Sequence, residues 1–221
     1  MKIGGLLKFS VLDYPGKLSC VVFCQGCFLR CTYCHNPEFQ PCEASAGVDF
    51  QEFLDFLKSR SGCLDAVVFS GGEPLLQTDL IQVIEIVKEL GFFVGIHTSG
   101  VVPNMFKKVV SLVDWIGFDI KTVFRKYDIV TQFQGSGLLV KIGLEILLNS
   151  GVSYEIRTTY DSRFISQEDV LKVAEILQKL GVREWTIQEC VIRDTDEALL
   201  LPDKNVVEEA SKLVRVNLRH Q

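Results

Sequence analysis

Six short runs of β-branched and aromatic residues alternate with amphipathic stretches along most of this chain of 221 residues. That alternation is typical of βα units, which place parallel strands side by side and cover them with helices. Six units are fewer than the eight of a closed (β/α) barrel. We therefore expect an α/β fold with a partial (β/α)6 TIM-like barrel, its core at about residues 18–192. The predicted strands are Leu18–Cys24, Ala66–Phe69, Phe92–His97, Trp115–Asp119, Tyr154–Thr159 and Glu184–Gln188.

Helix signals stand between the predicted strands. Residues 80–90 place apolar side chains at the helical period and predict one buried face. Ser166, three residues before Asp169, predicts a capping box that opens a later helix. No linker or repeat interrupts the chain, so we expect one domain, 1–221, with a helical tail at about 203–216. Four glycines are placed to end helices: Gly62, Gly91, Gly151 and Gly181.

Composition excludes several classes of partner. The formal net charge is −5 and no basic stripe stands out, so we expect no nucleic acid partner. No apolar run approaches the roughly 18 residues of a membrane span, and Gly4, Gly5 and Lys8 interrupt the N-terminus, so we expect neither a membrane span nor a signal peptide. We expect a cytoplasmic protein, in which eight cysteines indicate metal ligands or reactive thiols rather than disulfides.

Cys27, Cys31 and Cys34 form a C-x3-C-x2-C run that could wrap one inorganic centre. Thiolates suit iron–sulfur clusters, and a [4Fe–4S] cube normally takes four of them. Three would leave one iron open for chemistry, as in catalytic zinc sites. Cys24 raises three alternatives: a closed electron-transfer cluster, a zinc site, or a thioredoxin-like pair with Cys27. We expect Cys24 instead to be buried, because it shares one face of a predicted strand with Cys20.

The run from Cys24 to Glu38 resembles the cluster loop of radical S-adenosylmethionine (SAM) enzymes. Its ending, His35-Asn36-Pro37-Glu38, is similar to that of the activases of glycyl radical enzymes. The opening from Ile3-Gly4-Gly5-Leu6 to Asp13-Tyr14-Pro15-Gly16-Lys17 resembles the activating proteins of anaerobic ribonucleoside-triphosphate reductases. The resemblance implies the radical SAM fold, a cluster loop at 24–38 whose three cysteines hold a [4Fe–4S] cluster, and SAM bound at the open iron.

The same resemblance implies contacts to SAM. Ser70-Gly71-Gly72-Glu73-Pro74 is similar to a SAM-binding Gly-Gly-Glu-Pro motif, in which glycines permit close approach of a ligand to the backbone. Asp119 and Lys121 end a predicted strand and resemble the activase Asp-x-Lys motif, whereas His97 replaces an aspartate that activases often carry. A structural ion pair stays open for the polar groups at strand ends. The expected cofactor-binding residues are Tyr33, Gly71, Gly72, Glu73, Thr98, Asp119, Lys121, Arg157 and Gln188.

The activity implied by this resemblance is reductive cleavage of SAM at the cluster and formation of a glycyl radical on a partner enzyme. We expect that partner to be the anaerobic ribonucleoside-triphosphate reductase, and a flavodoxin- or ferredoxin-type protein to donate electrons. One alternative is an activase of another glycyl radical enzyme, such as pyruvate formate-lyase. A second is a radical SAM enzyme that converts a small molecule without a protein partner, such as a 7-carboxy-7-deazaguanine synthase. The third is an electron carrier with four cluster ligands and no SAM.

Overall fold

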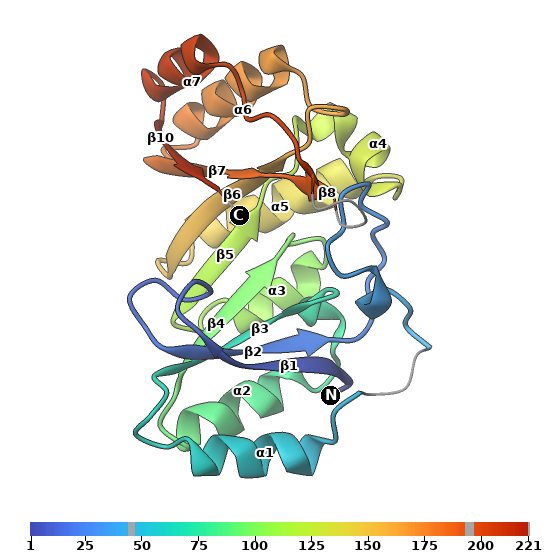
Figure 1. The fold of residues 1–221 in the computed structure, drawn as a ribbon, viewed down its shortest axis with the longest axis vertical. Helices are drawn as coiled ribbons and strands as arrows, with labels where there is room; N and C mark the ends of the chain where they lie inside the picture. Colours follow the sequence, from blue (N-terminus) through green and yellow to red (C-terminus); the bar gives the residue numbers. More distant parts are fainter. Residues whose placement is uncertain (44–46, 193–196, 221) are drawn as a thin grey trace. The chain divides into compact units, whose positions relative to one another are not determined.

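The computed structural model of this chain describes residues 1–43, 47–192 and 197–220 (Figure 1). The chain divides into two compact units. Unit 1 contains Met1–Phe28, Asn36–Gly117 and Ile142–Tyr154, and unit 2 contains Leu29–His35, Phe118–Lys141 and Glu155–Gln221. Each unit has parallel strands and helices of its own. The single domain expected over 1–221 stays a prediction.

Unit 1 is built on neighbouring strands in the order β1-β2-β3-β4. β1 runs antiparallel to β2, whereas β2, β3 and β4 are parallel. The strands are β1 (Ile3–Ser10), β2 (Ser19–Cys24), β3 (Ala66–Gly71) and β4 (Phe93–Thr98). The helices are η1 (Pro37–Phe39), α1 (Phe50–Ser59), η2 (Pro74–Leu76), α2 (Leu80–Glu89) and α3 (Pro103–Val109).

Unit 2 contains the parallel neighbours β6, β7 and β10. Along the chain, β5 (Trp115–Asp119), α5 (Ser136–Leu148) and β6 (Ser153–Tyr160) each begin in one unit and end in the other. The other elements of unit 2 are η3 (Phe124–Lys126), α4 (Tyr127–Thr131), α6 (Gln167–Lys179), β7 (Glu184–Glu189), β8 (Val191–Ile192), β9 (Glu197–Ala198), α7 (Lys204–Ser211) and β10 (Arg215–Arg219).

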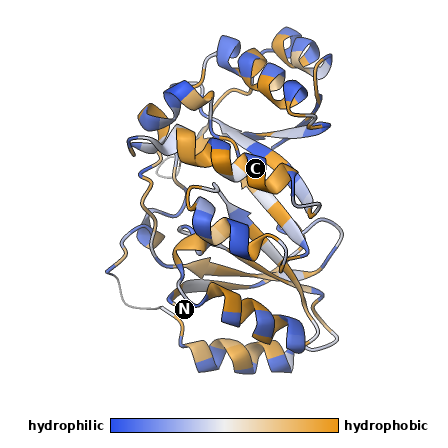
Figure 2. Cartoon of the chain, turned by 180° about the vertical axis from the view of Figure 1, so that it is seen from behind, coloured by the Kyte–Doolittle hydropathy of each residue, from blue (hydrophilic) through white to orange (hydrophobic). Residues whose placement is uncertain are grey.

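The predicted α/β fold with parallel strands is confirmed. The six predicted strands match β2 to β7 within two residues at each end. The capping box is present, since the Ser166 hydroxyl accepts from Asp169 N and the Asp169 carboxylate accepts from Ser166 N. In α2 the apolar face is buried as expected, and Figure 2 shows hydrophobic and hydrophilic residues alternating along the helices. The glycines predicted to end helices all have positive φ angles, as expected for residues that stop a helix: Gly62, Gly91, Gly151 and Gly181.

The helical tail expected at about 203–216 is wrong in its second half. The helix α7 ends at Ser211, and β10 follows as a strand that pairs with β7 from Arg215 to Arg219. The run Arg-Val-Asn-Leu-Arg alternates polar and apolar residues, as a half-exposed strand does, but it is too short for the pattern to identify a strand by itself. The exposed backbone edge of β7 supplies the pairing that the sequence pattern does not reveal. The antiparallel strand β1 was likewise not predicted.

The core of unit 1 includes part of the opening segment. The Tyr14 ring packs on Trp115, with ring centroids 5.4 Å apart, and joins a buried cluster with Val21, Ala66 and Val68. A Cβ added at Gly95 would lie 3.1 Å from the Tyr14 ring, so a glycine on β4 makes room for it. Within the described residues, no helix is both long enough and apolar enough to cross a membrane.

Candidate active site

The first part of the cluster loop is fixed by backbone hydrogen bonds within unit 1. Gly26 N donates to Phe39 O at 2.8 Å and Cys27 N donates to Gln40 O at 2.9 Å, so η1 and the residue after it flank the loop. Directly after β3, Gly72 N donates to Cys24 O at 2.8 Å and Glu73 N donates to Gly26 O at 2.9 Å. The segment after β3 is therefore attached directly to the segment after β2.

The glycine pair after β3 permits this attachment. A Cβ at Gly71 would lie 2.6 Å from Cys24 N, and the φ of +96° at Gly71 itself favours glycine. A Cβ at Gly72 would lie 2.3 Å from Gly26 O. The close approach expected at these glycines is thus, in this structure, an approach of the chain to itself. Any larger residue at Gly72 would displace the cluster loop as well as any ligand.

Glu73 and Thr98, two of the predicted site residues, contact each other. The buried Glu73 carboxylate accepts from Thr98 Oγ1 at 2.6 Å, Ser99 Oγ at 2.7 Å, Ser99 N at 3.1 Å and Leu75 N at 3.2 Å. Burial raises the pKa of Glu73, and the donors on Thr98 and Ser99 partly oppose that rise. The carboxylate therefore ties the end of β4 to the Gly-Gly-Glu-Pro segment, and Ser99, which sequence reasoning missed, is part of this link.

Cys24 is buried, as predicted from its strand face. Cys20, Val22 and Cys24 are all fully buried in β2. Burial, followed by the charges of Glu73 and Asp79, raises the pKa of Cys24 well above that of an ordinary thiol. An ionised thiolate is the metal-binding form, so this environment disfavours Cys24 as a ligand.

The second part of the cluster loop lies in unit 2 and contains Cys31 and Cys34. Cys34 N donates to Cys31 O at 3.1 Å, which closes a tight turn between the two cysteines. Both side chains are partly exposed. Burial of its sulfur raises the pKa of Cys31, and the positive charge of Lys121 opposes that rise. A nearby ammonium group favours the thiolate that a cluster would need.

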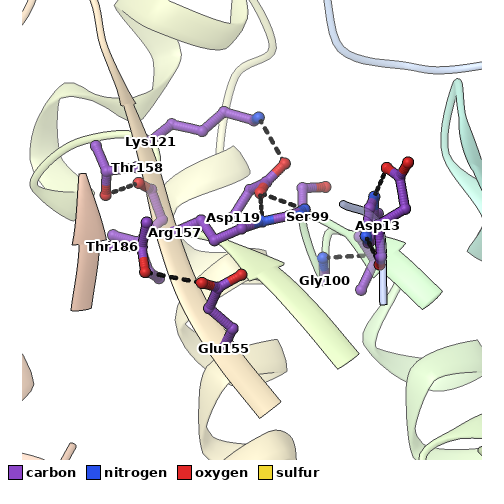
Figure 3. A network of polar contacts seen from close by, with 12 residues as sticks. Asp13, Ser99, Gly100, Asp119, Lys121, Glu155, Arg157, Thr158 and Thr186 are labelled. Atoms are coloured by element: carbon purple, nitrogen blue, oxygen red, sulfur yellow. Dashed lines mark hydrogen bonds and ion pairs between the residues drawn. The ribbon is translucent and has the colours of Figure 1, made fainter. Parts of the chain in front are cut away.

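Asp119, Lys121 and Arg157 form one charged group in unit 2, shown in Figure 3. Arg157 Nε and Nη2 donate to Asp119 Oδ1 at 3.1 and 3.0 Å, and Lys121 Nζ lies 3.7 Å from Asp119 Oδ2. Lys121 Nζ also lies 5.6 Å from the centroid of the Tyr33 ring. Arg157 and Lys121 are nearly buried, whereas the Asp119 side chain is 35% exposed. Four predicted site residues therefore lie together: Tyr33, Asp119, Lys121 and Arg157. The contact of Arg157 with Asp119 is the kind of structural ion pair that the sequence left open as an alternative.

Among the described residues, no hydrogen bond or ion pair joins the Gln188 side chain to that charged group. Gln188 pairs in register with Thr159 on β6 and with Arg219 on β10. The polar network on these strands centres instead on Glu155, which accepts from Thr186 Oγ1 at 2.8 Å (Figure 3). Glu155 also accepts from Arg219 Nη2 at 2.6 Å. Sequence reasoning missed Glu155 and Arg219. The available signal was that Glu155 lies two residues before Arg157 on a predicted strand, so both side chains share one face.

His97 contacts the opening segment of unit 1. His97 Nε2 lies 3.0 Å from Asp13 O, and its ring meets Trp115 edge-on at 5.5 Å. His97 thus joins β4 to the Asp13-Tyr14-Pro15-Gly16 turn.

The donor set fits an iron–sulfur cluster and a polar cofactor. Within the described residues, no three His, Cys, Asp or Glu side chains converge as ligands of a single metal ion would. In a [4Fe–4S] cluster each thiolate binds a different iron, so the cluster does not require its ligands to converge on one ion. Buried Thr32 Oγ1, between Cys31 and Cys34, and buried Thr122 Oγ1, beside Lys121, have no hydrogen-bond partner. Such groups are expected to be satisfied when a ligand is bound.

The chain matches one family model over most of its length. The model describes the radical SAM superfamily and matches residues 21–197. Over an alignment 227 positions long, the chain is 31% identical to the "Putative glycyl-radical enzyme activating enzyme MJ1227" of Methanocaldococcus jannaschii, covering 96% of this chain and 91% of that protein. Over 192 residues it is 33% identical to the pyruvate formate-lyase-activating enzyme of Clostridium pasteurianum, covering 81% of this chain and 77% of that one.

Solved structures of low identity share the fold. SuiB of Streptococcus suis bound to SAM superposes with a TM-score of 0.67 at 12% identity, over 91% of this chain and 49% of SuiB. A domain of a pyruvate-formate lyase-activating enzyme from Bacteroides vulgatus superposes with a TM-score of 0.53 at 16% identity, over 70% of this chain and 98% of that domain. The chain therefore spans about half the length of SuiB.

Proposed function

This chain belongs to the radical SAM superfamily, and we propose that it forms a glycyl radical on an anaerobic ribonucleoside-triphosphate reductase. The coarser assignment rests on the match to glycyl-radical-enzyme activases over nearly the whole chain. The chain is thus a radical SAM enzyme of the activase class, a class that uses a [4Fe–4S] cluster and SAM.

The observation that carries the proposal is the cluster loop and its attachment to the Gly-Gly-Glu-Pro segment. Cys27, Cys31 and Cys34 would hold the cluster, and one iron would remain open. Cys24 is buried, with a raised thiol pKa, and so would not complete a closed cluster. This argues against the simple electron carrier, which needs a fourth protein thiolate.

The cluster and SAM, when bound, would supply the one-electron chemistry that removes a hydrogen atom from a glycine of the partner. The residues of this chain would bind and orient the cofactor. Lys121 carries a positive charge beside Tyr33, and Asp119 is held by Arg157. These groups, with the backbone of Gly71 and Gly72, with Thr98 and with Gln188, are the proposed SAM contacts. Glu73 would act by fixing the backbone, because its carboxylate already accepts four hydrogen bonds.

The choice of reductase rests on the opening segment. Asp13-Tyr14-Pro15-Gly16 resembles the opening of reductase activators, and in this structure the segment is part of the core of unit 1 through Tyr14 and Trp115. A second candidate partner is pyruvate formate-lyase, because activating enzymes of that lyase are among the relatives of this chain. A flavodoxin- or ferredoxin-type protein is the proposed electron donor.

A radical assay tests the proposal. The chain is reconstituted with iron and sulfide without oxygen, reduced, mixed with SAM and then with either the reductase or the lyase. We expect a glycyl radical doublet in the electron paramagnetic resonance (EPR) spectrum with the reductase. A doublet with the lyase alone would move the assignment to the second candidate. Efficient conversion of a small molecule without any protein partner would overturn the activase proposal.

Two cysteine variants serve as matched controls for the same assay. Cys31→Ala should lose the cluster and the radical. Cys24→Ala should keep about four irons per chain, the content of one cube, and should still form the radical. Loss of iron in Cys24→Ala equal to that in Cys31→Ala would instead favour a four-thiolate cluster.

A further inference from the structure

The short helix α4 contacts the cluster loop at the residues on either side of Cys31. Arg30 N donates to Thr131 O at 2.7 Å, and Thr32 N donates to Val130 O at 3.1 Å. Both carbonyls belong to the last residues of α4, and the last carbonyls of any helix lack partners within the helix. The backbone N–H groups of the cluster loop therefore satisfy two carbonyls at the end of this helix.

The end of α4 has a specific conformation that frees these carbonyls. Gln132 follows the helix with a φ of +52°, the left-handed region that stops a helix abruptly. Thr131 Oγ1 donates to Tyr127 O and lies 2.8 Å from Ser136 Oγ, and Asp128 accepts from Gly135 N. These hydrogen bonds fix the conformation of the turn after α4. The Val130 and Thr131 carbonyls that accept from the cluster loop are therefore held in position.

The first residue of α4 contacts the Asp-x-Lys segment. The Tyr127 hydroxyl accepts a hydrogen bond from Lys121 N at 2.8 Å, and Tyr127 is fully buried. One helix of five residues thus binds the backbone of the cluster loop at its end and the backbone of Lys121 at its start. All of these residues belong to unit 2.

We propose that α4 is the element that sets the position of Cys31 relative to Asp119 and Lys121, with Tyr127 as its positioning residue. The proposal rests on the function given above, because it assumes that the cluster and SAM bind at these residues. Tyr127 touches neither group in this role. It acts through the backbone of Lys121, whose side chain lies beside Tyr33.

The variant Tyr127→Phe removes only the hydroxyl and tests the proposal. In the protein without its cluster, the Lys121 amide should exchange its hydrogen about tenfold faster, because a buried N–H loses its acceptor. In the reconstituted and reduced protein, iron content should stay unchanged. The SAM concentration that half-saturates the change in the EPR signal of the cluster should rise about tenfold, because the lost hydrogen bond no longer fixes the backbone of Lys121.

Tyr160→Phe is the matched control. Tyr160 is a second buried tyrosine of unit 2, at the end of β6, and no hydrogen bond among the described residues joins its hydroxyl to Lys121 or to the cluster loop. It should lower the melting temperature no more than Tyr127→Phe does and should leave the SAM half-saturation unchanged. Should Tyr127→Phe fail to fold, Thr131→Val is the second variant, for which we expect faster amide exchange at Arg30 and Thr32.

Neither readout requires a partner enzyme, so the two proposals can fail separately. A normal SAM response in Tyr127→Phe, together with unchanged exchange at Lys121, would overturn the positioning role even if the wild type activates the reductase. A wild type that holds its irons but never responds to SAM would overturn the proposed function, and amide exchange at Lys121, Arg30 and Thr32 would still decide whether α4 fixes these segments.

Discussion

At the scale of single residues, Glu73 shows how one carboxylate can serve the fold next to a cofactor site. A buried carboxylate is costly unless hydrogen bonds replace its hydration. Glu73 meets that condition with donors from Thr98, Ser99 and Leu75. The motif residue therefore contributes to the site chiefly by holding the segment after β3 against the end of β4.

The raised pKa of Glu73 predicts a pH-dependent contribution to stability. The folded chain holds this proton to a higher pH than the unfolded chain does. The contribution of Glu73 is therefore greatest at low pH and is lost as pH rises from the ordinary glutamate pKa through the raised one. Glu73→Gln does not titrate, and it loses an acceptor at a cost of roughly 1–3 kcal/mol. The stability advantage of the wild type over this variant should shrink as pH rises.

Urea unfolding of the cluster-free protein at several pH values measures this difference. Glu85→Gln is the control, since Glu85 is an exposed glutamate on α2. Its stability should follow that of the wild type at every pH. Parallel profiles for the wild type and Glu73→Gln would contradict the predicted proton uptake at Glu73.

At the scale of elements, α7 and β10 complete unit 2. The helix α7 buries Val206 and Ala210, and β10 pairs with β7 in register. An added parallel strand satisfies the backbone edge of β7, and the helix before it covers apolar surface. The last residues of the chain thus extend the parallel strands rather than form a separate tail.

Two proline substitutions test the role of α7. Val207→Pro removes the hydrogen bond from Val207 N to Asp203 O and should cost about 3 kcal/mol, or roughly 6–12 °C in melting temperature for a chain of this size. Lys204→Pro should cost little, because Lys204 is the first helical residue and Asp203 before it is already extended, with a ψ of 143°. Equal losses for both variants would contradict the assigned start of α7.

At the scale of the whole molecule, cofactor binding can be followed by its effect on the stability of the chain. A ligand that binds only the folded protein stabilises it by mass action, whatever the distribution of its contacts. Melting of the whole chain is therefore a direct measure of SAM binding.

We expect SAM to raise the melting temperature of the reconstituted protein. At about 100 times its dissociation constant, a ligand contributes about 2.7 kcal/mol, which corresponds to roughly 5–10 °C for a protein of this size. The measurement is an anaerobic thermal melt with and without SAM, with ATP as a control that shares the adenosine group. Equal shifts with ATP and SAM would argue against a site for the methionyl part of SAM.

The sequence by itself determined the six central strands and the capped helix at Ser166, because each depends on a local pattern of apolar spacing or capping. Only the tertiary structure decided which neighbours those residues meet. The glycine pair lies against Cys24 and Gly26, Arg157 pairs with Asp119, and β10 joins β7. These contacts join residues far apart along the chain, so their partners are fixed by packing and by backbone hydrogen bonds, which leave no local signal in the sequence.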